Sequence, residues 1–239
     1  MKNAFILSLG SLLVALTSCS SGGNSVTPLP DQSQVMFVHS SYPQATTTLQ
    51  FTADNAAVGQ VGYGQGSGYI LLTAGSHSLA ATALASSTAT LVKDQSYSLF
   101  AYSTSAAGTP SSLLVNDDLT APTVGQARLR LINLAANVVG GDLKVAQAIT
   151  TPTGTTYKDL TYIVSSNSFS GFTDFTPATT SLVVLDANNN VLAQVGNGGG
   201  GGTGVLKYQS GKLYTIIAAG DKNATSTASQ LKAFVLNNN

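Results

Sequence analysis

The stretch ARLRL at residues 127–131 alternates apolar residues with arginines. A period of two residues is typical of a β-strand with one buried face, because successive side chains point to opposite sides of a sheet. The alternation therefore predicts that Leu129 and Leu131 lie in a core, whereas Arg128 and Arg130 face water. Other stretches bounded by Gly, Pro, Asn or Asp are also expected to be strands, at residues 79–83, 96–102, 181–185, 205–208 and 214–218.

An internal repeat is predicted from four pairs of similar segments. VMFVHS at residues 35–40 aligns with LRLINL at residues 129–134, at an offset of 94. The other pairs follow in the same order at offsets of 103, 117 and 120, namely SGYILLT at 67–73 with SGFTDFT at 170–176, SYSLFA at 96–101 with LYTIIA at 213–218, and Leu114-Val115 with Phe234-Val235. Steadily rising offsets are expected of one unit that occurs twice, with longer loops in the second copy.

The composition favours strands and turns over helices. Of the 239 residues 43% are hydrophobic, only 8% are charged, and all ten acids are Asp. Ser, Thr, Gly and Asn, which are poor helix formers, are abundant. The predicted fold class is all-β, with two tandem immunoglobulin-like β-sandwich units at residues 34–120 and 126–239. Residues 117–125, which contain Pro122, are the expected junction.

The charge of the chain excludes one class of partner. Ten Lys and Arg residues balance ten Asp, so that the formal net charge is 0, and no run of either sign occurs. A protein that binds nucleic acid needs a basic patch to neutralise phosphates. No nucleic-acid partner is therefore expected.

The N-terminus has the pattern of a bacterial lipoprotein precursor. Residues 1–18 combine Lys2, an apolar stretch and small residues, as a secretory signal peptide does. The segment LTSC at residues 16–19 resembles a lipobox, in which the chain is cut before the cysteine and a lipid is attached to its thiol. Cys19, the single cysteine, is the predicted lipid-attachment site, and the membrane is the first predicted partner.

The predicted anchor implies a location and a tether. Residues 19–33 are rich in Ser and Gly and then contain prolines, as expected of a lipidated tether. The resemblance to lipoproteins implies the bacterial cell envelope. Ser20, in place of Asp, favours the outer membrane by analogy with enteric lipoproteins.

Several of these segments also resemble domain of unknown function 4397. VMFVHSSYP at residues 35–43 and ARLRLIN at 127–133 are similar to the opening strand of that family, and LTAG at 72–75 is similar to the turn of its central hairpin. The resemblance covers most of residues 34–237 and implies a β-rich, extracytoplasmic protein without a defined activity. The second copy departs from the family pattern at Asn133, where the family often has His.

The two histidines are poor candidates for a metal or catalytic site. His39 and His77 have no Cys partner and lack the H-x-H and H-E-x-x-H spacings of metal ligands. His39 aligns with Asn133, and a polar side chain that bonds a loop carbonyl would explain both positions. No metal and no cofactor are expected.

Two glycine-rich stretches are expected to be turns. GQGSG at residues 64–68 places its Ser one residue too late for a G-x-S-x-G nucleophile and precedes a strand rather than a helix. Residues 196–204 lack the following helix and the Lys of a phosphate-binding loop, so a mobile hairpin tip is predicted there.

The aspartates are the remaining catalytic candidates, because paired carboxylates hydrolyse glycans in many enzymes. Those considered are Asp117, Asp118, Asp142, Asp159, Asp174 and Asp186. Asp117 and Asp118 lie in the predicted junction, where solvated turn residues are expected. Because no catalytic motif accompanies these carboxylates, no catalytic residue is assigned and the protein is predicted not to be an enzyme.

The tyrosines divide into two groups. Tyr69, Tyr97 and Tyr214 lie at repeat positions and are expected to pack in the cores. Four others lie nearer to predicted turns, where binding surfaces collect, and these are Tyr42, Tyr63, Tyr157 and Tyr208.

The sequence thus predicts a noncatalytic, membrane-anchored envelope lipoprotein that presents two β-sandwich units for binding or adhesion. A glycan or an envelope protein is its expected partner. One alternative is a structural or assembly component of the periplasmic envelope, and another is an enzyme with an unrecognised carboxylate site. Exposure at the cell surface would favour the first reading over the second, and inward-facing aspartates in a deep cleft would favour the third.

Overall fold

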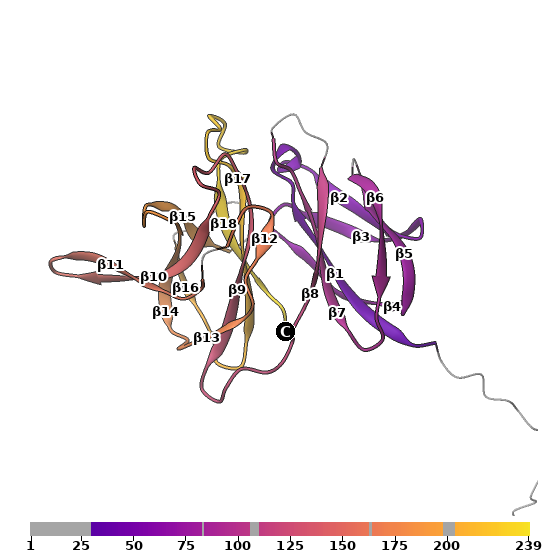
Figure 1. Cartoon of the computed structure of the whole chain (residues 1–239), viewed down its shortest axis with the longest axis horizontal. Helices are drawn as coiled ribbons and strands as arrows, with labels where there is room; N and C mark the ends of the chain where they lie inside the picture. Colours follow the sequence, from indigo (N-terminus) through magenta and orange to yellow (C-terminus); the bar gives the residue numbers. More distant parts are fainter. Residues whose placement is uncertain (1–29, 83, 106–109, 163, 198–203) are drawn as a thin grey trace, which may run out of the picture.

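The computed structural model describes residues 30–82, 84–105, 110–162, 164–197 and 204–239 (Figure 1). The predicted signal peptide, Cys19 and most of the tether lie outside these residues. The described residues form strands β1 to β18 and one short 3-10 helix, η1 (Tyr42–Gln44), so the all-β fold class is confirmed. In this part of the chain, no helix is long and apolar enough to cross a membrane.

The N-terminal half of the described chain forms two four-stranded sheets that pack face to face. In order across the sheet, sheet A contains β4 (Gly66–Thr73), β1 (Gln32–Ser40), β7 (Ser96–Tyr102) and β8 (Ser111–Asn116). Sheet B contains β3 (Ala56–Gly62), β2 (Thr48–Ala53), β5 (Gly75–Ala81) and β6 (Leu84–Leu91). Phe37 of β1 and Phe51 of β2 meet in the core between them. This half is therefore β-sandwich-like.

The C-terminal half contains two further sheets. Sheet C contains β12 (Ser168–Phe169) and β13 (Thr173–Phe175), which both pair with β9 (Ala127–Ala136), followed by β17 (Leu213–Asp221) and β18 (Lys232–Asn237). Sheet D contains β11 (Gly154–Asp159), β10 (Leu143–Thr151), β14 (Thr179–Asp186) and β15 (Val191–Gly196), with β16 (Val205–Lys207) also paired to β14. Because β15 pairs with both β14 and β18, the two sheets are continuous.

The strand pairing of the first half recurs in the second. β1 pairs antiparallel with β4 and parallel with β7, and β9 pairs in the same way with β12, β13 and β17. Val35 lies opposite Tyr97, as Leu129 lies opposite Tyr214, which agrees with the offsets of 94 and 117. The internal repeat is therefore present in the fold, whereas the immunoglobulin-like class of each unit and its boundaries stay predictions.

The last of the four predicted offsets was wrong by one residue. Leu99 lies opposite Leu114, whereas Ile216, its counterpart, lies opposite Val235, so that the offset there is 121 rather than 120. A slip of one residue moves a side chain to the other face of a strand. Phe234 accordingly lies in a different core from Leu114.

Sheets A and C pack against each other and join the two halves through a shared core. Apolar side chains from both sheets form one buried cluster that includes Met36, Val38, Phe100, Ile132, Ile217 and Phe234. The layers follow the order B, A, C and D, with β1 and β7 of one half beside β9 and β17 of the other (Figure 1). The two halves are thus in direct contact over the faces of two sheets.

This packing corrects two expectations about exposure. Arg130 was expected to face water, but sheet A covers that face of β9 and leaves Arg130 only 2% exposed. The side chain of Arg128 is 15% exposed, because the junction and Phe172 lie against it. Asp117 was expected to be a solvated turn residue and is buried, whereas Asp118 is 56% exposed as expected.

Candidate binding groove and buried polar network

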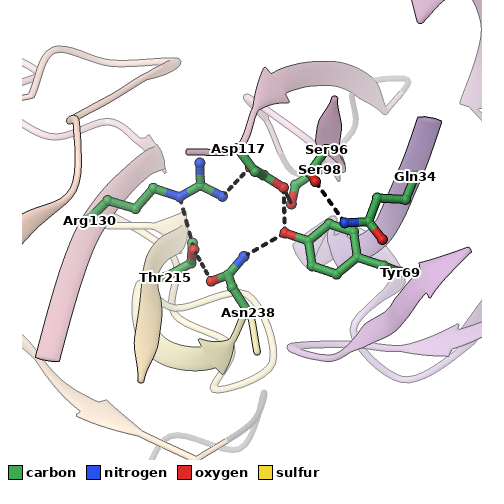
Figure 2. A network of polar contacts seen from close by, with 8 residues as sticks. All are labelled: Gln34, Tyr69, Ser96, Ser98, Asp117, Arg130, Thr215 and Asn238. Atoms are coloured by element: carbon green, nitrogen blue, oxygen red, sulfur yellow. Dashed lines mark hydrogen bonds and ion pairs between the residues drawn. The ribbon is translucent and has the colours of Figure 1, made fainter. Parts of the chain in front are cut away.

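A buried ion pair connects the two halves. Asp117, directly after β8, accepts a hydrogen bond from Nη2 of Arg130 at 2.6 Å (Figure 2). The same carboxylate accepts hydrogen bonds from the hydroxyls of Ser98 at 2.6 Å and Tyr69 at 2.7 Å. Asp117 and Ser98 belong to the first half and Arg130 to the second, so the pair fixes how the halves meet.

The network closes on itself through the second half. Nε of Arg130 donates to Thr215 at 2.9 Å, Thr215 donates to Asn238 at 2.7 Å, and Nδ2 of Asn238 donates to the Tyr69 hydroxyl at 3.1 Å (Figure 2). Burial, together with the Asp117 carboxylate, raises the pKa of Tyr69, which keeps its hydroxyl protonated as a donor. Because these groups have partners inside the protein, the network is suited to holding the halves together.

A surface groove lies next to the buried network, and Asp118, which directly follows Asp117, is one of its lining residues. Three adjoining hollows of about 430, 540 and 210 Å³ have Thr173 of β13 in common. Their walls come largely from residues 118–126 in and directly after the junction, residues 158–162 at the end of β11 and beyond it, and residues 172–176 around β13. Tyr162, which lines the two largest hollows, is 84% exposed. We call this surface the Tyr162 groove.

The charged side chains of the groove are held in pairs. Asp118 accepts hydrogen bonds from Arg128 at 2.7 Å and from the Thr120 backbone at 3.0 Å, and these bonds hold its pKa at about 2. Asp159 contacts Nζ of Lys144 at 2.6 Å. Asp118 therefore stays ionised at neutral pH, and the ion pairs hold both carboxylates in fixed orientations.

Phe172 links the groove to the buried network. The guanidinium carbons of Arg130 and Arg128 lie 4.7 Å and 5.3 Å from the centre of its ring. Guanidinium groups at this distance are attracted to the negative face of an aromatic ring. Phe172, which lines the groove, is thus in contact with Arg130 of the network between the halves.

The structure alters the assignment of the tyrosines. Tyr97 and Tyr214 are buried as expected, and their hydroxyls accept hydrogen bonds from the backbone N–H groups five residues upstream, at 3.1 and 2.9 Å. Such a tyrosine corner is a feature of Greek-key sandwiches. Among the four expected near binding surfaces, Tyr157 is 39% exposed, but the others are buried under neighbouring strands or rings, and these are Tyr42, Tyr63 and Tyr208.

Tyr162 was missed by the sequence reasoning. It lies between β11 and β12, in a segment that is longer than its counterpart between β3 and β4 in the first half. An aromatic residue in a loop that only one copy carries has no packing partner prescribed by the repeat. The difference in loop length between the two copies was therefore the signal in the sequence that could have pointed to Tyr162.

The histidines hold loops, as the alignment of His39 with Asn133 predicted. Nδ1 of His39 accepts a hydrogen bond from the Ser41 N–H, and Nε2 lies 3.2 Å from the carbonyl oxygen of Gln44. Nδ2 of Asn133 donates to the carbonyls of Gly141 and Val164, each at 2.8 Å. Burial lowers the pKa of His39, which favours the neutral ring.

His77 pairs with Asp54, and its Nε2 faces both the carbonyl oxygen and, at 3.4 Å, the hydroxyl of Thr73. Its Nδ1 lies 2.7 Å from the Asp54 carboxylate, while Nε2 lies 2.7 Å from the carbonyl oxygen of Thr73. A base that activates a hydroxyl needs a free Nε2 lone pair. Over the described residues, no three His, Cys, Asp or Glu side chains are placed to hold a metal ion.

The aspartates considered as catalytic candidates are divided between separate structural roles. Asp117 lies in the buried network, and Asp186 accepts hydrogen bonds from the backbone of Asn188 and Asn190 in a turn. Asp118 and Asp174 come together on either side of Arg128, at 2.7 and 3.7 Å.

The structure describes the first of the two glycine-rich stretches in full and the second only in part. Gly64, with a φ of 73°, lies in a turn before β4 as predicted, whereas Gly68, with a φ of 76°, lies inside β4, where its register with β1 shifts. Residues 198–203 of the second stretch lie outside the described residues, as does Cys19, and the strand expected after that stretch is β16.

Comparison with known proteins gives one family match. A family model described as "Domain of unknown function (DUF4397)" matches residues 25–140. No curated protein matches the chain. Among solved structures, a leucine-rich repeat protein from Bacteroides thetaiotaomicron VPI-5482 is 12% identical, with a TM-score of 0.18, over 84% of this chain and 26% of that protein.

The family match includes both members of the buried ion pair. It runs from the predicted tether through β9 and thus contains Asp117 and Arg130. Beyond residue 140 the expected resemblance stays a prediction. Over residues 25–140, just under half of its length, this chain is thus similar to the DUF4397 family.

Proposed function

We propose that this protein is a noncatalytic bacterial envelope lipoprotein that is anchored by a lipid on Cys19 and binds a partner in the Tyr162 groove. The groove carries the proposal, because it combines adjoining hollows, an exposed aromatic ring and oriented polar groups. Ligand sites often have this composition and are often formed by loops on a rigid scaffold.

The position of the groove in the fold supports presentation away from the anchor. The described chain enters through β1 in the half that contains sheets A and B, whereas β11 and β13 belong to the other half (Figure 1). The segment from Cys19 to Gln32 spans at most about 45 Å when extended. This length would hold the protein near a membrane and leave the second half free to meet a partner.

The side-chain pairing of the candidate residues supports a noncatalytic role. His39 and His77 use their ring nitrogens in loop contacts, and the groove carboxylates are paired with Arg128 or Lys144. A general acid or base needs a pKa near the working pH. Asp118, with its pKa of about 2, stays ionised instead.

An assembly role in the periplasmic envelope is the second candidate, and β11 favours it. All six residues of this strand, Gly154–Asp159, are exposed, and β11 lies at the edge of its sheet. An open strand edge is able to pair with a strand of another protein.

Site-specific photocrosslinking in intact cells tests the proposal. A benzophenone amino acid would replace Tyr162 in one variant and Tyr157 of β11 in a matched control. We expect heavier adducts from position 162 and none from position 157. Adducts from position 157 alone would favour the assembly role, and the absence of adducts from position 162 would contradict binding at the groove.

A further inference from the structure

We propose that the Tyr162 groove binds a neutral oligosaccharide. This inference rests on the proposed function, because it specifies the ligand of the same site. It is carried by the shape of the groove, its exposed aromatic ring and the balance of its charges.

The shape of the groove suits a chain rather than a single small molecule. Its hollows adjoin, since Tyr162 and Thr173 both line the two largest, and Thr173 also lines the third. Single ligand pockets of drug-sized molecules have volumes of about 300–1,000 Å³. Two hollows of this size and a smaller one, which all meet at Thr173, offer neighbouring places for linked units.

Tyr162 supplies a flat apolar surface where the two largest hollows meet. Tyr162 is 84% exposed, whereas the ring of Phe172 is already in contact with two guanidinium groups. One face of a sugar ring carries only C–H groups, which pack well on an aromatic ring, while the tyrosine hydroxyl remains able to hydrogen-bond. Tyr162 is therefore the stacking platform in this proposal.

The carboxylates around the platform are oriented acceptors for sugar hydroxyls. Asp174 accepts a hydrogen bond from Thr123 at 2.6 Å, and Asp118 and Asp159 are held by Arg128 and Lys144. A carboxylate has about four lone-pair sites, so each retains free ones after these contacts. Because the side chains are already fixed, little conformational entropy is lost when a hydroxyl binds.

The charge balance argues against an ionic ligand. Three bases, Arg128, Lys144 and Lys158, line the groove together with three acids, Asp118, Asp159 and Asp174. The formal charges cancel, and most are engaged in ion pairs within the groove. A site for phosphate or a uronic acid would be expected to present a surplus of one sign.

Isothermal titration calorimetry of the detergent-solubilised full chain tests the ligand class. The probes are neutral hexamers of glucose, mannose, galactose, xylose and N-acetylglucosamine, with an anionic hexamer of galacturonic acid and a cationic hexamer of glucosamine. We expect a neutral hexamer to bind with little dependence on salt. Preferential, salt-sensitive binding of a charged hexamer would overturn the proposal, as would binding of none of the neutral ones.

A pair of variants tests the stacking platform. Tyr162→Ala should weaken binding of the neutral hexamer by about tenfold, the order expected for a lost aromatic contact, whereas Tyr157→Ala should bind as the unaltered protein does. Unchanged binding by Tyr162→Ala would contradict the proposal. If photocrosslinking at position 162 captures a protein while the neutral sugars do not bind, the ligand class is wrong and the proposed binding function stands.

Discussion

At the scale of single residues, Asp117 and Arg130 form an ion pair whose contribution to the stability of the protein depends on its burial. Their side chains are 0% and 2% exposed and lie 2.6 Å apart between the two halves. The alternation in ARLRL placed Arg130 on the face of the strand away from its own core. It carried no information about the second sheet that covers that face, so the sequence predicted the strand but not the ion pair.

Removing the carboxylate should strongly destabilise the protein. Asp117→Ala leaves the Arg130 guanidinium buried without its counterion, which should cost about 3–5 kcal/mol of unfolding free energy. Asp118→Ala, which removes a carboxylate that is 56% exposed, should cost about 0–1 kcal/mol. Urea unfolding of the two variants measures the difference, and equal losses would contradict a special role for the buried pair.

His39 should contribute to the pH dependence of the unfolding free energy. Because burial lowers the pKa of His39 below 6.5, the usual value for histidine, the unfolded state binds more protons, and the stability from neutral His39 is lost as pH falls below 6.5. His39→Asn, which copies Asn133, should reduce this loss. Urea unfolding at one pH above 6.5 and one below it measures this loss, and the same pH dependence in both proteins would argue against this role.

At the scale of elements, Gly220 in β17 illustrates a position where only glycine fits. Its φ is 110°, and an added Cβ would lie 2.4 Å from the carbonyl oxygen of Gln230. Gly220→Ala should therefore cost about 3 kcal/mol, the upper end of the cost of a strained backbone. Gly171→Ala, where a Cβ meets nothing within 4 Å, is the control. A similar melting temperature for both variants would show that β17 tolerates the change.

The elements also show what local patterns predict. Alternation and turn residues located β7 and β14, and the offsets placed Val35 and Leu129 at equivalent positions. They failed for Tyr42 and Tyr63, which follow strand ends and yet are buried in the shared core. A turn residue is exposed only if no other part of the chain packs on it, and that contact is formed at long range.

The candidate site could likewise be predicted only in its local features and not in its long-range contacts. The sequence pointed to aromatic residues near turns but selected Tyr157 and not Tyr162, because the groove depends on three segments that meet only in the folded chain. The sequence identified the aspartates as candidates, but it did not predict that they pair with Arg128 and Lys144.

At the scale of the whole molecule, the shared core predicts cooperative unfolding. Met36, Val38 and Phe100 of the first half are buried against the second half. Separation would expose these side chains, so the two halves should unfold in one transition. Scanning calorimetry should give equal calorimetric and van't Hoff enthalpies. Two resolved transitions would show that the halves are independent.

The proposed function of the whole molecule depends on the lipid anchor at Cys19. Fractionation of cells that produce the unaltered protein or Cys19→Ser tests this anchor directly, because the substitution removes the thiol that would carry the lipid. The unaltered protein should be found in the membrane fraction and Cys19→Ser in the soluble fraction. If Cys19→Ser remains in the membranes, or if the unaltered protein is soluble, lipid anchoring through Cys19 is wrong.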